Sequence, residues 1–243
     1  MALRLLGSVM RTRKTFVTAG LIMAAIAALL VPREAAAQAI PPAAPRDENW
    51  EAVSQISMLT GVASVALMPR VYYNDPDATV GWKGRWHVSQ LAPALTLTAV
   101  TLFIDTPVKG AIESTRPGCT IDETRVAFPD SECESFGGPS THAFASSATF
   151  GAGLAIWIFD TFVYSDSEFH AGSFIGNVAV PLTAAVLTSV ARGIAPGESE
   201  SFEDGGQIGA GIAVGLPIGF LTGMAYTLLQ EPNCGYGNNI ICW

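Results

Sequence analysis

Apolar stretches close to the length of a membrane-crossing helix recur along this chain of 243 residues. A helix needs roughly 20 predominantly apolar residues to cross a bilayer. Five stretches approach that length, and they lie at 53–69, 88–108, 140–164, 173–192 and 207–230. A mean hydropathy of +0.36 with only 14% charged residues is also too apolar for an ordinary soluble domain. The sequence therefore predicts an all-α fold, a polytopic transmembrane helical bundle of five helices in the mature chain.

The first 39 residues have the composition of an export signal. Basic residues precede an apolar run at 16–31, and the small-residue stretch 35–39 then offers a cleavage site. The alternative is that the apolar run stays as an uncleaved anchor. In either case we divide the rest of the chain into a Pro- and Ala-rich linker at 40–52, a membrane domain at 53–230 and a C-terminal tail at 231–243.

An exported start and five crossings set the expected topology. The loops 109–139 and 193–206 then lie outside, and the loops 70–87 and 165–172 lie inside with the tail. We expect a multi-pass protein of the bacterial inner membrane whose outer loops face the periplasm. The net charge of −8 argues against a nucleic-acid partner, because such a protein needs a basic face.

Four cysteines form two sequence-local pairs. Cys119 and Cys133 fall in the long outer loop, where a disulfide would stiffen the connection. Cys234 and Cys242 fall in the tail, and their pairing stays open. Neither spacing resembles a zinc site, and we expect no metal and no cofactor.

Basic and hydroxyl side chains gather at the ends of helices that face the outside. Lys109 and Arg116-Pro117 follow the second predicted helix, Pro139-Ser140 with His142 begins the third, and Arg192 ends the fourth. Arginine forks, a lysine and free amides at a helix start are the groups that hold a phosphate. Ser140 is placed as an N-cap, and His142 can exchange a proton near neutral pH.

These motifs resemble those of the type 2 phosphatidic acid phosphatase and vanadium haloperoxidase superfamily. The family pattern Lys-x6-Arg-Pro matches Lys109, Arg116 and Pro117, and Pro-Ser-Gly-His matches 139–142 with threonine in place of glycine. The third pattern, Ser-Arg-x5-His-x3-Asp, matches at Arg192. There Glu198 stands where the family has its histidine, and Asp204 is the nearest acid before the last helix.

The resemblance implies a role for each matching residue. Three cations would hold the phosphoryl oxygens, Ser140 would donate a hydrogen bond, and His142 would protonate the leaving oxygen; the cations are Lys109, Arg116 and Arg192. The family's nucleophile is the histidine that Glu198 replaces, and Asp204 would take the place of the acid that orients it. The two remaining histidines, at 87 and 170, lie on the opposite side in the expected topology.

Three hypotheses follow. The first is a membrane phosphatase that hydrolyses a phosphate monoester or pyrophosphate of a lipid, of the phosphatidic acid or isoprenyl pyrophosphate type, at the outer face. The second is a catalytically inactive relative that keeps a phosphate-binding pocket as a binding or structural module. The third is an unrelated helical scaffold. The partners expected from the resemblance are a phosphorylated lipid and the membrane, and the oligomeric state stays open.

Each of these residues also has an interpretation without a functional site. Lys109 and Arg116 could extend to lipid headgroups, as basic residues at helix ends commonly do. The acidic run before the last helix reads as a solvated loop, and this is what we expect for Glu198, Glu200 and Glu203.

Overall fold

The computed structural model describes residues 46–68, 90–126, 133, 135–164, 169–196 and 199–229, all within one compact unit, Ala35–Trp243. These residues are predominantly helical and contain no β-strand, which confirms the all-α prediction for them. The predicted signal or anchor segment 1–39 and the tail 231–243 with its two cysteines lie outside the described residues.

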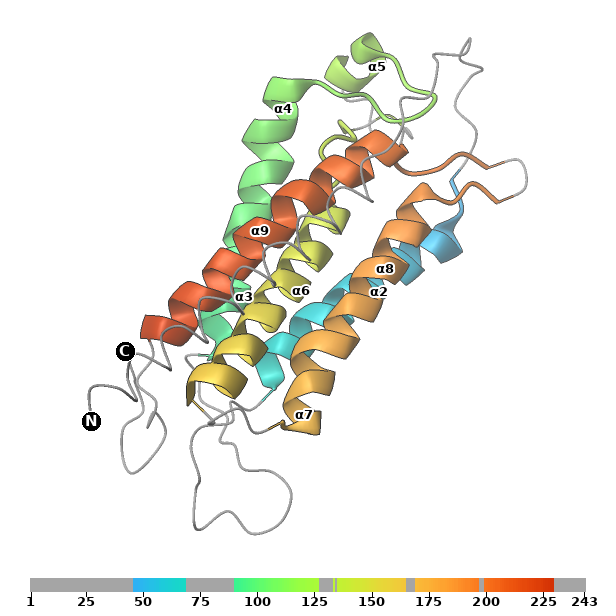
Figure 1. The fold of residues 1–243 in the computed structure, drawn as a ribbon. Coiled ribbons are helices and arrows are strands. Elements are labelled where there is room, and N and C mark those ends of the chain that lie inside the picture. Colours follow the sequence, from blue (N-terminus) through green and yellow to red (C-terminus); the bar gives the residue numbers. More distant parts are fainter. Residues whose placement is uncertain are drawn as a thin grey trace, which may run out of the picture. The chain divides into compact units, whose positions relative to one another are not determined.

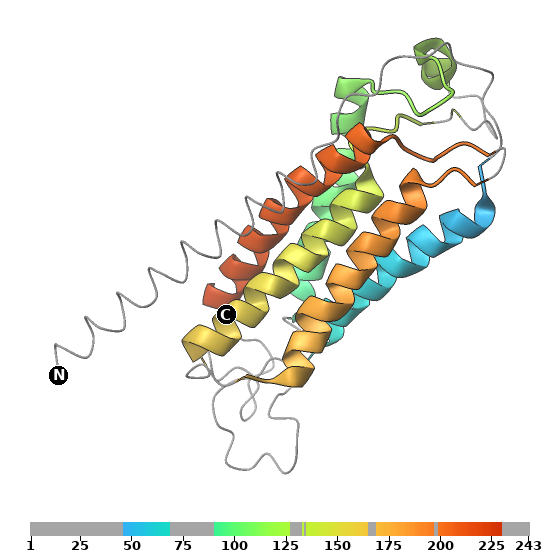
Figure 2. The ribbon, with the colours of Figure 1, turned by 45° about the vertical axis from the view of Figure 1, so that its right-hand side comes forward.

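Long helices lie side by side in the described part of the chain (Figures 1 and 2). The α-helices are α2 (Glu48–Leu67), α3 (Leu91–Phe103), α4 (Lys109–Ile112), α5 (Ile121–Val126), α6 (Thr141–Phe159), α7 (Ala171–Phe174), α8 (Val180–Gly193) and α9 (Gly205–Leu229). Wider π-helical turns extend or join them at η2 (Ile104–Val108), η3 (Asp160–Tyr164) and η4 (Ile175–Ala179). Two of these turns involve a proline, Pro107 inside η2 and Pro181 just after η4. Proline removes a backbone donor and is a common cause of such irregular turns.

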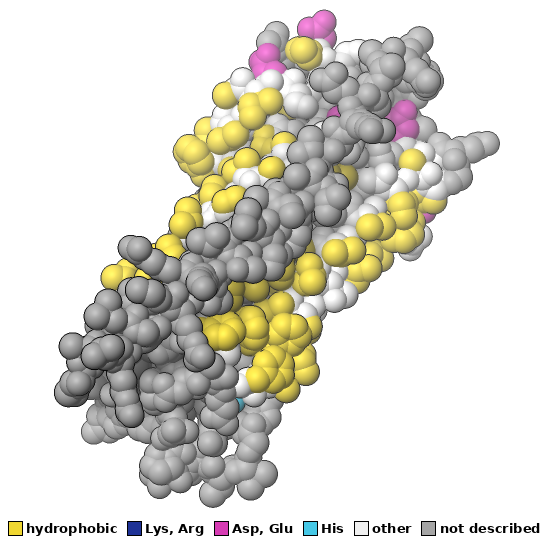
Figure 3. Space-filling model, viewed as in Figure 1, with side chains coloured by type: hydrophobic (Ala, Val, Ile, Leu, Met, Phe, Trp, Pro, Cys, Tyr) yellow, Lys and Arg dark blue, Asp and Glu magenta, His cyan; other side chains and the backbone are white. Residues whose placement is uncertain are grey.

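Four continuous helical segments are long and apolar enough to cross a membrane. They are Leu91–Ile112, Thr141–Val163, Ala171–Gly193 and Gly205–Leu229. Their bounds agree with the four later predicted segments to within four residues. Large apolar side chains are exposed along them, for example Leu95, Leu102 and Leu221, each more than half exposed. Figure 3 shows such side chains along the length of the helices, a surface suited to lipid.

The first predicted segment differs from the other four. It is helical, but it begins at Glu48 instead of residue 53, because the Asp47 carboxylate caps the helix by accepting from the backbone N–H groups of Asn49 and Trp50. Its first turn carries Glu48 and Glu51. Helix α2 is not among the four segments that qualify as membrane spans. The predicted boundary between linker and domain therefore falls inside a helix.

Helices α6 and α9 approach closely along a stripe of glycines on α9. The stripe consists of Gly211, Gly215, Gly219 and Gly223. A Cβ added at Gly219 would stand 1.8 Å from the Ala148 carbonyl oxygen, and one at Gly223 would stand 2.3 Å from that of Ala152. Small residues let helix backbones approach in this way inside a membrane.

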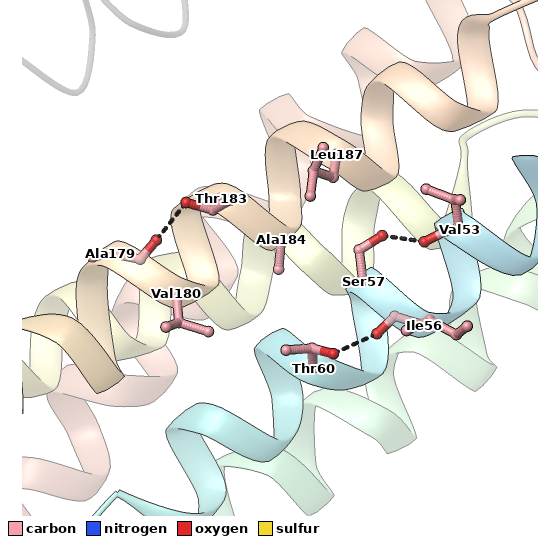
Figure 4. Close-up of a pocket in the computed structure, with 9 residues that line it drawn as sticks. All are labelled: Val53, Ile56, Ser57, Thr60, Ala179, Val180, Thr183, Ala184 and Leu187. Atoms are coloured by element: carbon pink, nitrogen blue, oxygen red, sulfur yellow. Dashed lines mark hydrogen bonds between the residues drawn. The ribbon is translucent and has the colours of Figure 1, made fainter.

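A shallow groove of about 460 Å³ runs between α2 and α8. Three hydroxyl side chains line it, but each donates to a carbonyl of its own helix: Ser57 to Val53, Thr60 to Ile56 and Thr183 to Ala179 (Figure 4). A hydroxyl that is bonded back to its own helix no longer offers its proton to a neighbour. The groove therefore presents a largely apolar surface.

The loop after α4 is tied down by a disulfide between Cys119 and Cys133, which are 14 residues apart and both buried. Ser114 pairs with Gly138 in an isolated antiparallel bridge, and the Ser114 carbonyl accepts from the Gly137 N–H at 2.8 Å. The two ends of the loop are thus held together just before α6 begins.

Replacing Cys119 and Cys133 together by serine is expected to lower the free energy of unfolding by about 3 kcal/mol. The disulfide closes a loop of about 15 residues, and opening it restores that much conformational entropy to the unfolded chain. Thermal unfolding in detergent measures the effect, and peptide mapping of the wild type verifies the bridge. A variant as stable as the wild type would contradict the prediction.

Candidate anion-binding site

The predicted site residues come from four separate segments that meet at one end of the helices. This end holds the last turn of α4, the start of α6, the end of α8 and the start of α9 (Figures 1 and 2). The charges of Arg192, Lys109, Arg116 and Glu203 all act on the His142 ring. Lys109, Arg116, His142 and Arg192, which come from three sequence motifs, therefore lie near one another. His170 caps α7 and is not part of this cluster.

Arg192 is held by a buried carboxylate. Its Nε donates to Glu203 Oε2 at 3.2 Å, and its Nη2 donates to Glu203 Oε1 at 3.1 Å. Both side chains are at most 2% exposed. The Phe202 ring lies under the guanidinium, with Arg192 Cζ 4.5 Å from the ring centroid. This two-point contact is the geometry that an arginine fork uses for an oxyanion.

Ser140 connects the start of α6 to the same carboxylate. Its Oγ accepts from the Ala143 N–H at 3.1 Å, so Ser140 is the N-cap of α6 as its sequence position predicts. The same hydroxyl donates its proton to Glu203 Oε2. The Ser140 backbone N–H donates to the Gln207 carbonyl at 3.0 Å, which fixes the start of α6 against α9.

Lys109 is buried and has two polar partners. Its Nζ lies 3.0 Å from Asp105 Oδ1 and donates to Thr141 Oγ1 at 3.2 Å. Thr141 in turn donates to Asp105 Oδ1 at 3.1 Å. Threonine stands here in place of the family's glycine, and its hydroxyl completes a three-residue network. In this arrangement the lysine charge is partly compensated by Asp105, which is half exposed.

Arg116 is the cation of the cluster with the fewest contacts in the described residues. Its Nη2 donates to Ser135 Oγ at 2.8 Å, while its buried Nε has no hydrogen-bond partner there. His142 Nδ1 is likewise buried without a partner. Burial lowers the pKa of Arg116, and repulsion by Arg192 lowers it further, but a guanidinium stays protonated at neutral pH. Two polar atoms of the cluster are therefore available to a ligand.

Glu203 is ionised at neutral pH. Burial by itself raises the pKa of this carboxyl, but the charge of Arg192 and the hydrogen bonds from Arg192 and Ser140 outweigh it, so the pKa lies below its ordinary value of 4.5. The carboxylate therefore stabilises the fold at pH values above about 4.5. That stability is lost as the pH falls through the lowered pKa of the folded protein.

The melting temperature is therefore expected to drop in acid in a way that depends on Glu203. Between about pH 7 and pH 5 the melting temperature of the wild type is expected to exceed that of Glu203→Gln by a constant amount. Below about pH 4.5 this difference narrows as the wild-type carboxylate becomes protonated. Thermal unfolding of both proteins across this range measures the gap. A gap that widens in acid would show that the ionised form does not stabilise the fold.

The four acids named in the sequence interpretation have different positions, and Glu200 is half-buried with its Oε2 enclosed by protein. Asp204 caps α9, because its Oδ1 accepts from the Gln207 N–H at 2.8 Å while Gln207 Oε1 accepts from the Asp204 N–H at 3.1 Å. This reciprocal pair is a capping box, and Asp204 is exposed. Glu198 lies outside the described residues. The expectation that Glu203 is a solvated acid is wrong, because the side chain is 1% exposed and bonded to Arg192.

Sequence reasoning missed several members of the cluster. Arg46, in the predicted linker, donates to the Pro117 carbonyl at 3.4 Å, and its charge acts on Arg116. Asp105 faces Lys109 one turn earlier on the same helix, a spacing that the sequence displays. Glu203 and Gln207 have the four-residue spacing of the family's third motif, displaced by five residues from the expected position of its histidine.

Comparisons with known proteins add no relative to this description. No protein-family model matches the chain, and neither a curated protein nor a solved structure matches it. The residues of the site therefore carry the functional interpretation.

Proposed function

We propose that this protein binds the phosphate group of a membrane lipid without hydrolysing it, as a catalytically inactive relative of the membrane phosphatases that its motifs resemble. One observation carries the choice: the anion paired with Arg192 and Ser140 is the protein's own Glu203 carboxylate. Phosphoryl transfer in the family needs a histidine nucleophile near this arginine. A carboxylate here is engaged by two partners and repels the phosphate it would have to attack.

The capacity to bind an anion remains beside this ion pair. Arg116 Nε and His142 Nδ1 are buried polar atoms without partners in the described residues. A buried polar group without a hydrogen bond is costly, and an anion that accepts from it would remove that cost. A phosphate monoester or pyrophosphate would accept from the Arg116 guanidinium, with the charges of Lys109 and Arg192 nearby.

A lipid is the proposed source of that phosphate. A groove of about 600 Å³ runs between the α3–α4 helix and α9, with apolar walls that include Val100, Ile104 and Ile218. Its polar end reaches Pro139 and Gln207, next to Ser140 in the cluster. A hydrocarbon chain in this groove would bring a headgroup to the cluster.

The proposed location follows from the same features. The four apolar helices support a multi-pass membrane protein, and we propose the bacterial inner membrane with the site facing the periplasm. The disulfide at the same end as the site supports an oxidising compartment. We also propose that α2 forms a fifth crossing and that residues 1–39 are a signal or anchor segment.

A second candidate function is hydrolysis of that lipid phosphate. The observation in its favour is His142, which lies among three cations with a free ring nitrogen and could donate a proton to a leaving oxygen. In this case a nucleophile other than the Arg192-bound carboxylate would be required.

Two measurements on detergent-purified protein separate these functions. Phosphate release from phosphatidic acid, phosphatidylglycerol phosphate and undecaprenyl pyrophosphate is compared with binding of the same lipids, for the wild type, His142→Ala and Arg116→Gln. Binding that needs Arg116, with no release, supports the binding module. Release that disappears in His142→Ala supports the phosphatase. No release by any protein, with equal lipid binding by wild type and Arg116→Gln, would leave only a scaffold without an anion site.

A further inference from the structure

The Glu203 carboxylate occupies the position at which Arg192 and Ser140 would bind an external oxyanion. Both of its oxygens accept from the Arg192 fork, and Oε2 also accepts from Ser140. These are a guanidinium and a hydroxyl at a helix start, the kind of donor that recognises phosphate. The residue is 1% exposed, so the contact is enclosed by protein.

We propose that Glu203 is an internal anion that occupies the Arg192–Ser140 part of the site and keeps it closed to phosphate. Removal of the carboxylate opens this part to inorganic phosphate or to a phosphate monoester. The proposal rests on the proposed function, since it concerns the same site, and it adds the residue that limits what the site binds.

The geometry leaves room for one anion at this position. Ser140 Oγ accepts from the Ala143 N–H, and its single proton goes to Glu203. Glu203 accepts from Nε and Nη2 and so occupies this edge of the Arg192 guanidinium, while the Phe202 ring covers one of its faces. A second anion placed there would also meet the carboxylate at close range, where like charges repel strongly.

The groups near Glu203 explain why removal of its carboxylate creates a phosphate site. Arg192 contacts the carboxylate, and the charges of His142 and Arg116 interact with it. Without the carboxylate, the Arg192 guanidinium and the Ser140 hydroxyl line the vacated position, and the Arg116 charge acts on it. Glu203→Ala removes both the charge and the volume of the carboxylate.

The test measures binding of inorganic phosphate to the full chain in detergent by calorimetry, for wild type, Glu203→Ala and Asp122→Asn. Asp122 is an exposed acid on α5 and controls for the change in net charge. We expect Glu203→Ala to bind phosphate at least about tenfold more tightly than the other two proteins, because one charge-assisted contact becomes available. A parallel titration with phosphatidic acid micelles separates the sources: tighter binding of the lipid alone assigns the site to a headgroup, and tighter binding of both assigns it to phosphate in general.

Equal phosphate and lipid affinities in wild type and Glu203→Ala would overturn the inference and leave the proposed function intact. Absence of binding in every protein would overturn the proposed function. The inference is then decided by the melting temperature of Glu203→Ala, which formate, a carboxylate of the same charge, is expected to raise. No rise with formate overturns the inference. If Glu203→Ala purifies poorly, phosphate present throughout purification is expected to restore its yield, and no restoration counts against the proposal.

Discussion

Replacing Arg192 by methionine is expected to lower the free energy of unfolding by about 3–5 kcal/mol. Methionine keeps much of the side-chain volume but removes the charge, so the Glu203 carboxylate stays enclosed in protein with no counter-ion. Removal of one partner of a buried ion pair has this cost because the remaining charge loses both water and its partner. Reversible thermal or denaturant unfolding in detergent measures the change.

A double substitution separates the cost of the unpaired charge from the cost of altered packing. Arg192→Met combined with Glu203→Leu removes both charges, and apolar replacement of a buried pair is often neutral or stabilising. The double variant is therefore expected to recover most of the stability that the single variant loses. A double variant as unstable as Arg192→Met would mean that the carboxylate is not the cause.

Replacing Gly219 by alanine is expected to destabilise the protein by a net amount of about 1–2 kcal/mol. The added Cβ would stand 1.8 Å from the Ala148 carbonyl oxygen and 2.5 Å from its carbonyl carbon, so α9 must move away from α6. Overpacking of this kind typically costs about 1–3 kcal/mol. It outweighs the gain of about 1 kcal/mol that alanine brings to a helix. Thermal unfolding in detergent measures the net effect.

Gly110 provides a matched control in α4, because a Cβ there would meet nothing within 4 Å. Gly110→Ala is expected to be neutral or stabilising by up to about 1 kcal/mol. Equal effects of the two substitutions would show that the close approach of α6 and α9 is not what Gly219 provides.

The fold could be predicted where a helix is apolar along its whole length. The sequence predicts the bounds of the four helices that are long and apolar enough to cross a membrane to within four residues, because composition and length constrain them together. Ser140 was predicted as an N-cap from its place before an apolar run. Helix α2 was predicted less well, since its first turn carries Glu48 and Glu51 and hydropathy alone hides the cap at Asp47. Local hydrogen bonds determine such a boundary, and the apolar pattern does not record them.

The basic residues of the site could be predicted from the sequence, but its buried acidic residue could not. Lys109, Arg116 and Arg192 stand at helix ends, where a charge beside an apolar run is conspicuous in the sequence. Glu203 follows a run of acidic, serine and glycine residues that reads as solvated loop, and only the fold shows that it enters the protein to meet Arg192. A buried ion pair depends on the path of the loop between two helices, and no periodicity in the sequence encodes that path.

The glycine stripe does not by itself fix the position of α9 along the axis of α6, and polar contacts determine that position. A stripe with glycine at every fourth residue would match its partner again after a slide of four residues, roughly 6 Å along the helix axis. Gln207 removes this ambiguity, because its carbonyl accepts from the Ser140 N–H while its Nε2 donates to Ser114 Oγ at 2.9 Å and to the Thr115 carbonyl at 2.6 Å. Gln207 thus selects one of several equivalent axial positions of α9 against α6, and this position places Glu203 opposite Arg192.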